Sequence, residues 1–237
     1  MTYQELSNSY PTIQARFTGR RLSVITIRTS DTDLIEDMFS RLNEAVPLNA
    51  AEKRNAFGGP VPKAIRTLVE QPFFTTTLPI TPKRYRHHDL ACKFLLLQHE
   101  KRIVDTKKSR LDAFVNEFKE KELNLRTVQL RKAVQANLSK MEKFFRKDDP
   151  LLNSPLMCAV YYAMFKDGTL GDSKPGRSRK TLVAFESELE ANRKLELEES
   201  EDVNFALLEY ERIARSPNDA STISFRVGIL KDYLEEA

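Results

Sequence analysis

Charged and amide side chains are concentrated in residues 37–59, a segment that otherwise has the apolar spacing of two amphipathic helices. At about 100° per residue, Arg41 and Asn43 fall on the rims of the first apolar arc and are expected to be half-buried. A buried cation is costly unless a carboxylate or a phosphate meets it. Glu52 is the expected partner within the chain, and a nucleotide or nucleic-acid phosphate is the expected external partner. The residues leave two alternatives open, an internal Arg–Glu clamp and a polar site that faces a cleft.

Two helices must position these groups. Asp31 is a favourable N-cap for the first helix, which Pro47 ends. Asn49 can cap the second helix, which carries Glu52 in its first turn and ends at a pair of glycines.

A second cluster, residues 83–88, combines cations with an aromatic ring. Lys83, Arg84, Tyr85 and Arg86 are residue types that line grooves for single-stranded nucleic acid, where cations follow the backbone and rings stack on bases. A surface loop can have the same composition, so a nucleic-acid contact is one of two alternatives.

Asp105, Thr106 and Lys107 imitate the end of a metal-dependent nuclease motif, with Asp89 or Asp112 as a second carboxylate. That chemistry requires two carboxylates that converge on Mg²⁺ from a rigid sheet. The pattern here is helix and loop, so a solvated helix surface is the favoured interpretation and a stand-alone nuclease is the alternative.

His88, Cys92 and His99 could share one helix face, but zinc requires a fourth ligand and a more regular spacing. Cys92 and Cys158 lie in apolar helical patterns and are expected to be buried free thiols. The sequence therefore assigns no metal ligand and no catalytic residue.

The pattern F-x-R-L-N-x-x-x-P-L-N-x-x-E-x-R-N-A, residues 39–56, resembles the second signature of a large bacterial family. This is the ParB/sulfiredoxin-like restriction family, the domain of unknown function 262, typified by the GmrSD type IV restriction nuclease. Four later segments are similar to other parts of that family, and they are residues 65–74, 84–93, 105–114 and 204–234. The resemblance therefore covers nearly the whole chain.

The resemblance implies a role in anti-phage defence or DNA transactions. It implies that Arg41, Asn43, Glu52, Arg54 and Asn55 line a nucleotide or phosphate cleft, with the two arginines as bidentate phosphate donors. This chain contains neither the family's D-G-Q-Q-R motif, linked to nucleotide binding and hydrolysis, nor the HNH nuclease half of some relatives. We therefore expect the C-terminal portion of a family member, without catalysis or a bound cofactor of its own.

The expected partner is an upstream segment or subunit that bears D-G-Q-Q-R. The completed protein is expected to bind a nucleoside triphosphate with Mg²⁺. DNA and a second copy of the chain are further expected partners, and a helical interaction module without a ligand is the competing class of function.

Composition favours a helix-rich protein. Of 237 residues, 41% are hydrophobic and 30% charged, with 7 glycines and no tryptophan, which argues against a β-sandwich and a glycine-rich dinucleotide-binding fold. No apolar run approaches the ~20 residues needed to cross a bilayer, so a cytoplasmic location without membrane contact is expected. Residues 1–150 carry 27 Lys and Arg against 18 Asp and Glu, and residues 151–237 carry 11 against 16. This division suits a phosphate partner on the basic side.

The expected fold class is mainly α, a helical bundle with a small α+β remnant near the N-terminus. Residues 21–29 alternate as a strand does, and residues 75–80 can supply a short edge strand. A single strand cannot satisfy its own backbone groups, so further strands are expected upstream of Met1, in another chain or at 75–80. The expected domains are residues 1–82, the back part of an α+β domain, and residues 83–237, a helical domain.

Within the helical domain, Ser154 and Pro155 are expected to begin one helix and Asp167 and Gly168 to end it. Other helices are expected over residues 63–71, 89–104, 179–197, 203–215 and 220–235, with a linker over 168–178 and a turn over 216–219.

Overall fold

The computed structural model describes residues 2–21, 24, 26, 28–42, 47–100, 102–118, 125–171 and 175–236, with the backbone alone for residues 36, 39–42 and 175. The chain divides into two compact units, Met1–Met38 and Phe39–Ala237. The described residues are mostly helical and include no β-strand, which confirms the mainly α fold class.

The first unit contains two short helices, α1 (Tyr3–Ser9) and α2 (Pro11–Thr18). The rings of Tyr3 and Phe17 join them at a centroid distance of 6.4 Å. No residue of either helix is buried, so the apolar side chains of this pair are open to solvent.

Helix α3 (Thr32–Leu42) begins in the first unit. The carboxylate of Asp31 accepts hydrogen bonds from the backbone N–H groups of Asp33 at 3.0 Å and Leu34 at 3.1 Å. The predicted N-cap is therefore confirmed.

The strand expected over residues 21–29 is not present in the part of that segment that the structure describes. The residues described there belong to no strand, and they are Arg21, Val24, Thr26, Arg28 and Thr29. Leu22, Ser23, Ile25 and Ile27 lie outside the described residues.

The edge strand expected over residues 75–80 is wrong. Phe73–Thr77 forms one π-helical turn (η1), after which the N–H of Leu78 donates to the C=O of Phe73 at 2.9 Å. Phe73 and Phe74 are both buried, with their rings in T-shaped contact at 5.2 Å. Consecutive side chains of a strand point to opposite faces, so the burial of both rings in one core favours the helical turn.

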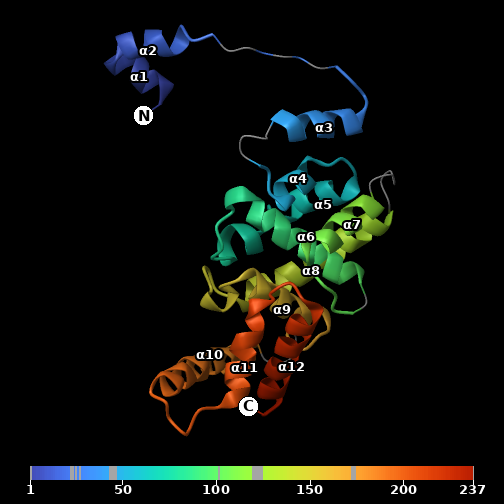
Figure 1. Cartoon of the computed structure of the whole chain (residues 1–237), viewed down its shortest axis with the longest axis vertical. Helices are drawn as coiled ribbons and strands as arrows, with labels where there is room; N and C mark the ends of the chain where they lie inside the picture. Colours follow the sequence, from blue (N-terminus) through green and yellow to red (C-terminus); the bar gives the residue numbers. More distant parts are fainter. Residues whose placement is uncertain are drawn as a thin grey trace. The chain divides into compact units, whose positions relative to one another are not determined.

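The second unit is an assembly of helices. After α3 these are α4 (Ala50–Ala56), α5 (Pro60–Leu68), α6 (Arg86–His99), α7 (Lys108–Glu117), α8 (Leu125–Phe144), α9 (Pro155–Lys166), α10 (Pro175–Leu197), α11 (Phe205–Arg212) and α12 (Ala220–Glu236), with 3₁₀ turns at Lys83–Tyr85 (η2), Pro150–Leu152 (η3) and Ile213–Arg215 (η4). Figure 1 shows α10, α11 and α12 grouped beside the C-terminus, with α4 and α5 toward the other end of this unit. None of the described helices is both long and apolar enough to span a bilayer.

Helices α6 and α9 form the centre of the second unit. Residues 156–165 of α9 are all buried, as are residues 90–97 of α6, where Lys93 is the one charged side chain. Phe94 of α6 stacks on Tyr162 of α9 with ring centroids 4.4 Å apart. Helices α5, α7, α8 and α12 pack around this pair, and one core of buried side chains continues across the domain boundary expected after residue 82.

Several predicted helix ends agree with the structure. Ser154 caps α9, Pro155 is its first residue, and α12 covers the predicted residues 220–235. Helix α6 ends earlier than predicted, because Glu100 is extended and Lys166 donates hydrogen bonds to carbonyl groups at the end of α6.

The segment 105–107 holds the start of α12. Oδ1 of Asp105 accepts the N–H of Ala220 at 2.7 Å, so this carboxylate caps a helix 115 residues later in the chain. Nζ of Lys107 pairs with Asp219 at 2.6 Å. These contacts fix the predicted turn before α12 to the loop that follows α6.

Asp105→Ala should lower the free energy of unfolding by about 0.5–2 kcal/mol, the usual effect of losing a helix cap. Urea unfolding followed by circular dichroism measures this change. Asp202→Ala is the matched control, since Asp202 is exposed and forms no ion pair with a described residue, and it should stay within about 0.5 kcal/mol. An equal destabilisation of the two variants would contradict the assigned cap.

Candidate functional site

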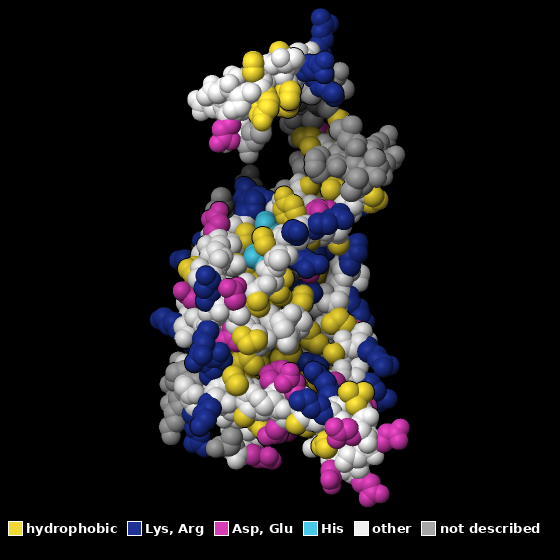
Figure 2. All heavy atoms as spheres, turned by 90° about the vertical axis from the view of Figure 1, so that its left-hand side faces the viewer, with side chains coloured by type: hydrophobic (Ala, Val, Ile, Leu, Met, Phe, Trp, Pro, Cys, Tyr) yellow, Lys and Arg dark blue, Asp and Glu magenta, His cyan; other side chains and the backbone are white. Residues whose placement is uncertain are grey.

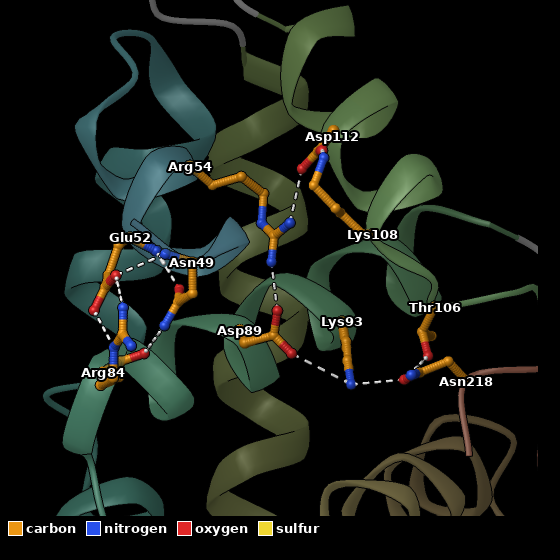
Figure 3. Close-up of polar contacts among 10 residues, drawn as sticks. All are labelled: Asn49, Glu52, Arg54, Arg84, Asp89, Lys93, Thr106, Lys108, Asp112 and Asn218. Carbon is orange, nitrogen blue, oxygen red and sulfur yellow. Dashed lines mark hydrogen bonds and ion pairs between the residues drawn. The ribbon is translucent and has the colours of Figure 1, made fainter. Parts of the chain in front are cut away.

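The capping box of α4 carries the predicted cap Asn49 and the predicted site residue Glu52. Oδ1 of Asn49 accepts the N–H of Glu52 at 2.9 Å, and Oε2 of Glu52 accepts the N–H of Asn49 at 2.8 Å. Glu52 also binds Arg84, whose Nε and Nη2 donate to its two carboxylate oxygens at 3.0 and 2.9 Å (Figure 3). The hydrogen bond from Arg84, followed by that from Asn49, lowers the pKa of Glu52.

The side chain of Arg41 and all of Asn43 lie outside the described residues, so the expected Arg41–Glu52 clamp is not placed. The described ionic partner of Glu52 is Arg84, which belongs to the second predicted cluster. One ion pair therefore connects the two clusters that the sequence singles out.

Arg84 and Tyr85 both have a left-handed backbone, with φ angles of 52° and 60°. This conformation costs about 1–2 kcal/mol for each residue that carries a Cβ, so the surroundings must hold it. Nδ2 of Asn49 donates to the C=O of Arg84 at 3.0 Å, and Nη2 of Arg84 donates to the C=O of Pro47 at 3.0 Å. The start of α4 thus holds the strained pair and leaves the Tyr85 side chain exposed. Strain of this kind clusters at functional sites.

Arg54 lies buried on α4, with its side chain 3% exposed. Nη1 donates to Oδ1 of Asp112 at 2.7 Å, and Nη2 donates to Asp89. Figure 3 shows the guanidinium between these carboxylates, one from α6 and one from α7. The arginine thus joins three helices, and its contact with a ligand phosphate stays a prediction.

Each of the two carboxylates has a lysine partner on its own helix. Lys93 lies one turn after Asp89, with Nζ 3.3 Å from the carboxylate, and Lys108 lies one turn before Asp112 at 2.6 Å. Lys93 also donates to Oδ1 of Asn218 at 2.9 Å. The network around Arg54 therefore reaches the turn before α12 (Figure 3).

Two hollows flank Arg84. The smaller, about 390 Å³, brings together residues from both predicted clusters, and its lining is Glu52, Asn55, Arg66, Pro82, Arg84, Tyr85 and His88. The larger, about 1250 Å³, is lined on one side by Asn49, Arg84 and Arg86 and on the other by residues of α10. Arg84 thus lies on the wall that the two hollows share.

Cations without a carboxylate partner lie on or beside the two hollows, with Arg66 lining the smaller one and Arg86 the larger one. Nη1 of Arg66 donates to the C=O of Asn55 at 3.2 Å. Neither Arg66, Lys83 nor Arg86 forms an ion pair with a described residue. Figure 2 shows Lys and Arg side chains on either side of the visible histidine atoms. Burial, followed by the charges of His87 and Arg66, lowers the pKa of His88, so its ring is neutral at neutral pH.

The side chains of the nuclease alternative are engaged elsewhere. Asp105 caps α12, Lys107 pairs with Asp219, and Asp112 binds Arg54. Within the ranges that the structure describes, no group of three or more His, Cys, Asp and Glu side chains is placed to hold a metal ion.

The two cysteines are free and fully buried, as predicted. Burial raises the pKa of Cys92 to about 12 and raises that of Cys158 further. A thiolate, which is the form that ligates metals, is therefore disfavoured at both positions.

Sequence reasoning missed the partners of Arg54. Asp89 with Lys93 and Lys108 with Asp112 have the four-residue spacing of helical ion pairs, and this spacing is a signal that the sequence carries. Local spacing does not show that Arg54, from a different helix, lies between these two carboxylates. That position is decided by tertiary packing.

No family model, curated protein or solved structure matches this chain. The geometry of the site therefore carries the functional argument.

Arg54→Met should lower the free energy of unfolding by about 1–3 kcal/mol, because it removes the charge-assisted hydrogen bonds to Asp89 and Asp112 while each carboxylate keeps its lysine partner. Chemical denaturation at neutral pH measures this destabilisation. Arg110→Met removes an exposed arginine that pairs with Glu100, and it should cost less than about 1 kcal/mol.

The stability difference between the wild type and Arg54→Met should also depend on pH. Burial acts to raise the pKa of Asp112, but hydrogen bonds from Lys108 and Arg54 outweigh it and hold the pKa below its ordinary value. The ion pair therefore stabilises the fold above that ordinary value, and its contribution is lost as pH falls through the lowered pKa. A difference that stays constant into strong acid would contradict the assignment.

Proposed function

We propose that this chain binds phosphate groups of a nucleotide or nucleic acid, as a non-catalytic portion of a restriction-type defence protein. The binding surface consists of Arg66, Lys83, Arg84, Tyr85 and Arg86, called here the basic ridge. The observation that carries the proposal is the left-handed Arg84–Tyr85 pair, which stands between two hollows and is held there by α4.

Each residue of the basic ridge has a distinct expected role. Glu52 neutralises Arg84, so Arg84 positions the ridge, while Arg66, Lys83 and Arg86 supply the uncompensated charge that attracts phosphate. Tyr85 is 38% exposed, and its ring can stack on a base. Cations next to an exposed ring favour single-stranded nucleic acid over an isolated phosphate ion.

The family resemblance supports the same surface. Glu52 and Asn55, which it assigns to a phosphate cleft, line the smaller hollow beside the basic ridge. In this proposal Arg41, Asn43 and a partner segment bearing D-G-Q-Q-R complete the cleft. The completed protein then binds a nucleoside triphosphate with Mg²⁺.

The double variant Arg66→Ala/Arg86→Ala should bind a fluorescent single-stranded DNA oligonucleotide more weakly than the wild type, as measured by anisotropy across a salt series. The slope of log affinity against log salt should fall by about 0.7 for each phosphate that the variant no longer neutralises. Arg215→Ala is the control, since Arg215 is also exposed and forms no ion pair with a described residue, but lies away from the ridge.

The same assay separates stacking from charge. Tyr85→Ala should weaken binding by about 1–3 kcal/mol, whereas Tyr85→Phe keeps the ring and should bind as the wild type does. Unchanged affinity and salt slope in the double variant would refute the basic ridge as the binding surface.

A helical interaction module is the second candidate function, and one observation favours it. Large apolar side chains on or beside α1, α2 and α3 are about half exposed or more, and they are Tyr3, Tyr10, Ile13, Phe17, Leu34 and Ile35. Exposed apolar faces of this kind mark association surfaces.

If this second candidate is correct, the purified chain should self-associate with rising concentration, as measured by light scattering after size-exclusion chromatography. Ile13→Ser/Phe17→Ser should remove that association without lowering the stability of the second unit, because neither side chain is buried. A monomer at every concentration would exclude self-association through these helices.

A further inference from the structure

Arg226 on α12 differs from the other largely buried arginines. Arg54 lies between two carboxylates, and Nη2 of Arg179 pairs with Asp149 at 2.9 Å. Arg226 is only 7% exposed, yet it forms no ion pair with any residue in the described ranges. A buried guanidinium remains charged, so this cation lacks the compensation that the other two receive.

The described contacts of Arg226 are all with neutral groups. Nη2 donates to the C=O of Tyr210 at 2.8 Å, and Nη1 donates to Sδ of Met157 at 3.0 Å. The guanidinium carbon lies 4.0 Å from the centre of the Tyr210 ring, and Nε has no acceptor among the described residues. A thioether is a weak acceptor, so these contacts hold the side chain in place without neutralising it.

Arg226 lines a cavity of about 500 Å³, a size typical of small-molecule sites. The start of α9 at Ser154, together with Met157, Lys93 and Asn218, lines the same cavity. A helix N-terminus carries partial positive charge, which adds to that of the guanidinium. We call this space the Arg226 cavity.

Two carboxylates also line the Arg226 cavity, but neither forms an ion pair with Arg226. Glu211 is bound by Arg193. Glu186 forms no hydrogen bond or ion pair with a described residue, although the charge of Arg226 acts on it. Burial raises the pKa of Glu186, as expected for a carboxyl group that lacks a direct partner. Glu186 and Arg226 therefore share a cavity wall without touching.

We propose that the Arg226 cavity binds a small molecule through a carboxylate or phosphate group, which Arg226 holds. The oxyanion supplies the negative charge that the fold does not bring into contact with this guanidinium. Glu186 weakens the binding of a bare oxyanion, because it places a like charge at the same cavity. No residue of the basic ridge lines the Arg226 cavity, although the larger hollow beside the ridge shares Glu186 and Arg193 with it. The proposal does not rest on the function proposed for the ridge.

The test uses the full chain labelled with ¹³C at its methionine methyl groups. Met157 touches Arg226, so its methyl resonance, assigned with Met157→Leu, reports on the Arg226 cavity. Inorganic phosphate and sodium acetate are titrated separately at constant ionic strength. We expect a saturable shift of the Met157 resonance with millimolar affinity. A response to phosphate alone indicates a phosphorylated ligand, and a response to acetate indicates a carboxylate ligand.

Two variants connect the shift to the proposed contacts. Arg226→Gln should weaken binding about tenfold or more, the usual effect of losing a charge-assisted hydrogen bond. Glu186→Gln removes the competing charge and should tighten binding. Because Glu186 forms no hydrogen bond or ion pair with a described residue, this variant should fold. It therefore tests the proposal even if Arg226→Gln does not fold.

A control variant distinguishes anion binding in the Arg226 cavity from anion binding at the basic ridge. Arg66→Ala/Arg86→Ala should leave the Met157 response unchanged, whether or not it affects DNA binding. The proposal is overturned if neither anion shifts the Met157 resonance. It is also overturned if a folded Arg226→Gln responds as the wild type does, or, where Arg226→Gln does not fold, if Glu186→Gln responds as the wild type does.

Discussion

The guanidinium of Arg54 lies between Asp89 and Asp112 and so fixes where α4, α6 and α7 meet. Both carboxylates remain partly exposed while the cation is buried. Water therefore reaches the carboxylates but not the guanidinium. Lys93 and Lys108 each pair with one of these carboxylates, so the cluster holds three cations and two carboxylates. Because α4 has only seven residues, propensity alone would not keep it helical, so its capping box and tertiary contacts such as this ion pair must stabilise it.

Helix α4 uses two neighbouring charges for different purposes. Arg54 points into the second unit, whereas Glu52 closes the capping box and holds Arg84 (Figure 3). The E-x-R pattern of residues 52–54 therefore has a structural role in this fold. Arg54 fixes α4 to α6 and α7, and Glu52 fixes Arg84 to α4. The strained backbone at Arg84 and Tyr85 is thereby held in a conformation that a free loop could not maintain.

Local chemistry made much of this fold predictable. Asp31, Asn49 and Ser154 act as the caps that their residue types predict, and the apolar spacing gives the helical class. Pairings between distant segments were not predictable, because Glu52 with Arg84 and Lys93 with Asn218 depend on how helices meet in space. The edge strand predicted over residues 75–80 was wrong for the same reason, because residues 75–77 belong to a helical turn whose first two side chains, Phe73 and Phe74, are buried in the core.

The contact of Asp105 with the start of α12 has a consequence for biosynthesis. Asp105 and Ala220 are 115 residues apart, and Lys93 and Asn218 are 125 apart. A ribosome delivers the earlier member of each pair long before the later one, so α6 and its following loop emerge with these polar groups still facing water. The contacts that join α6 and its following loop to the start of α12 can therefore form only after α12 has been released, and until then this side of the second unit is incomplete.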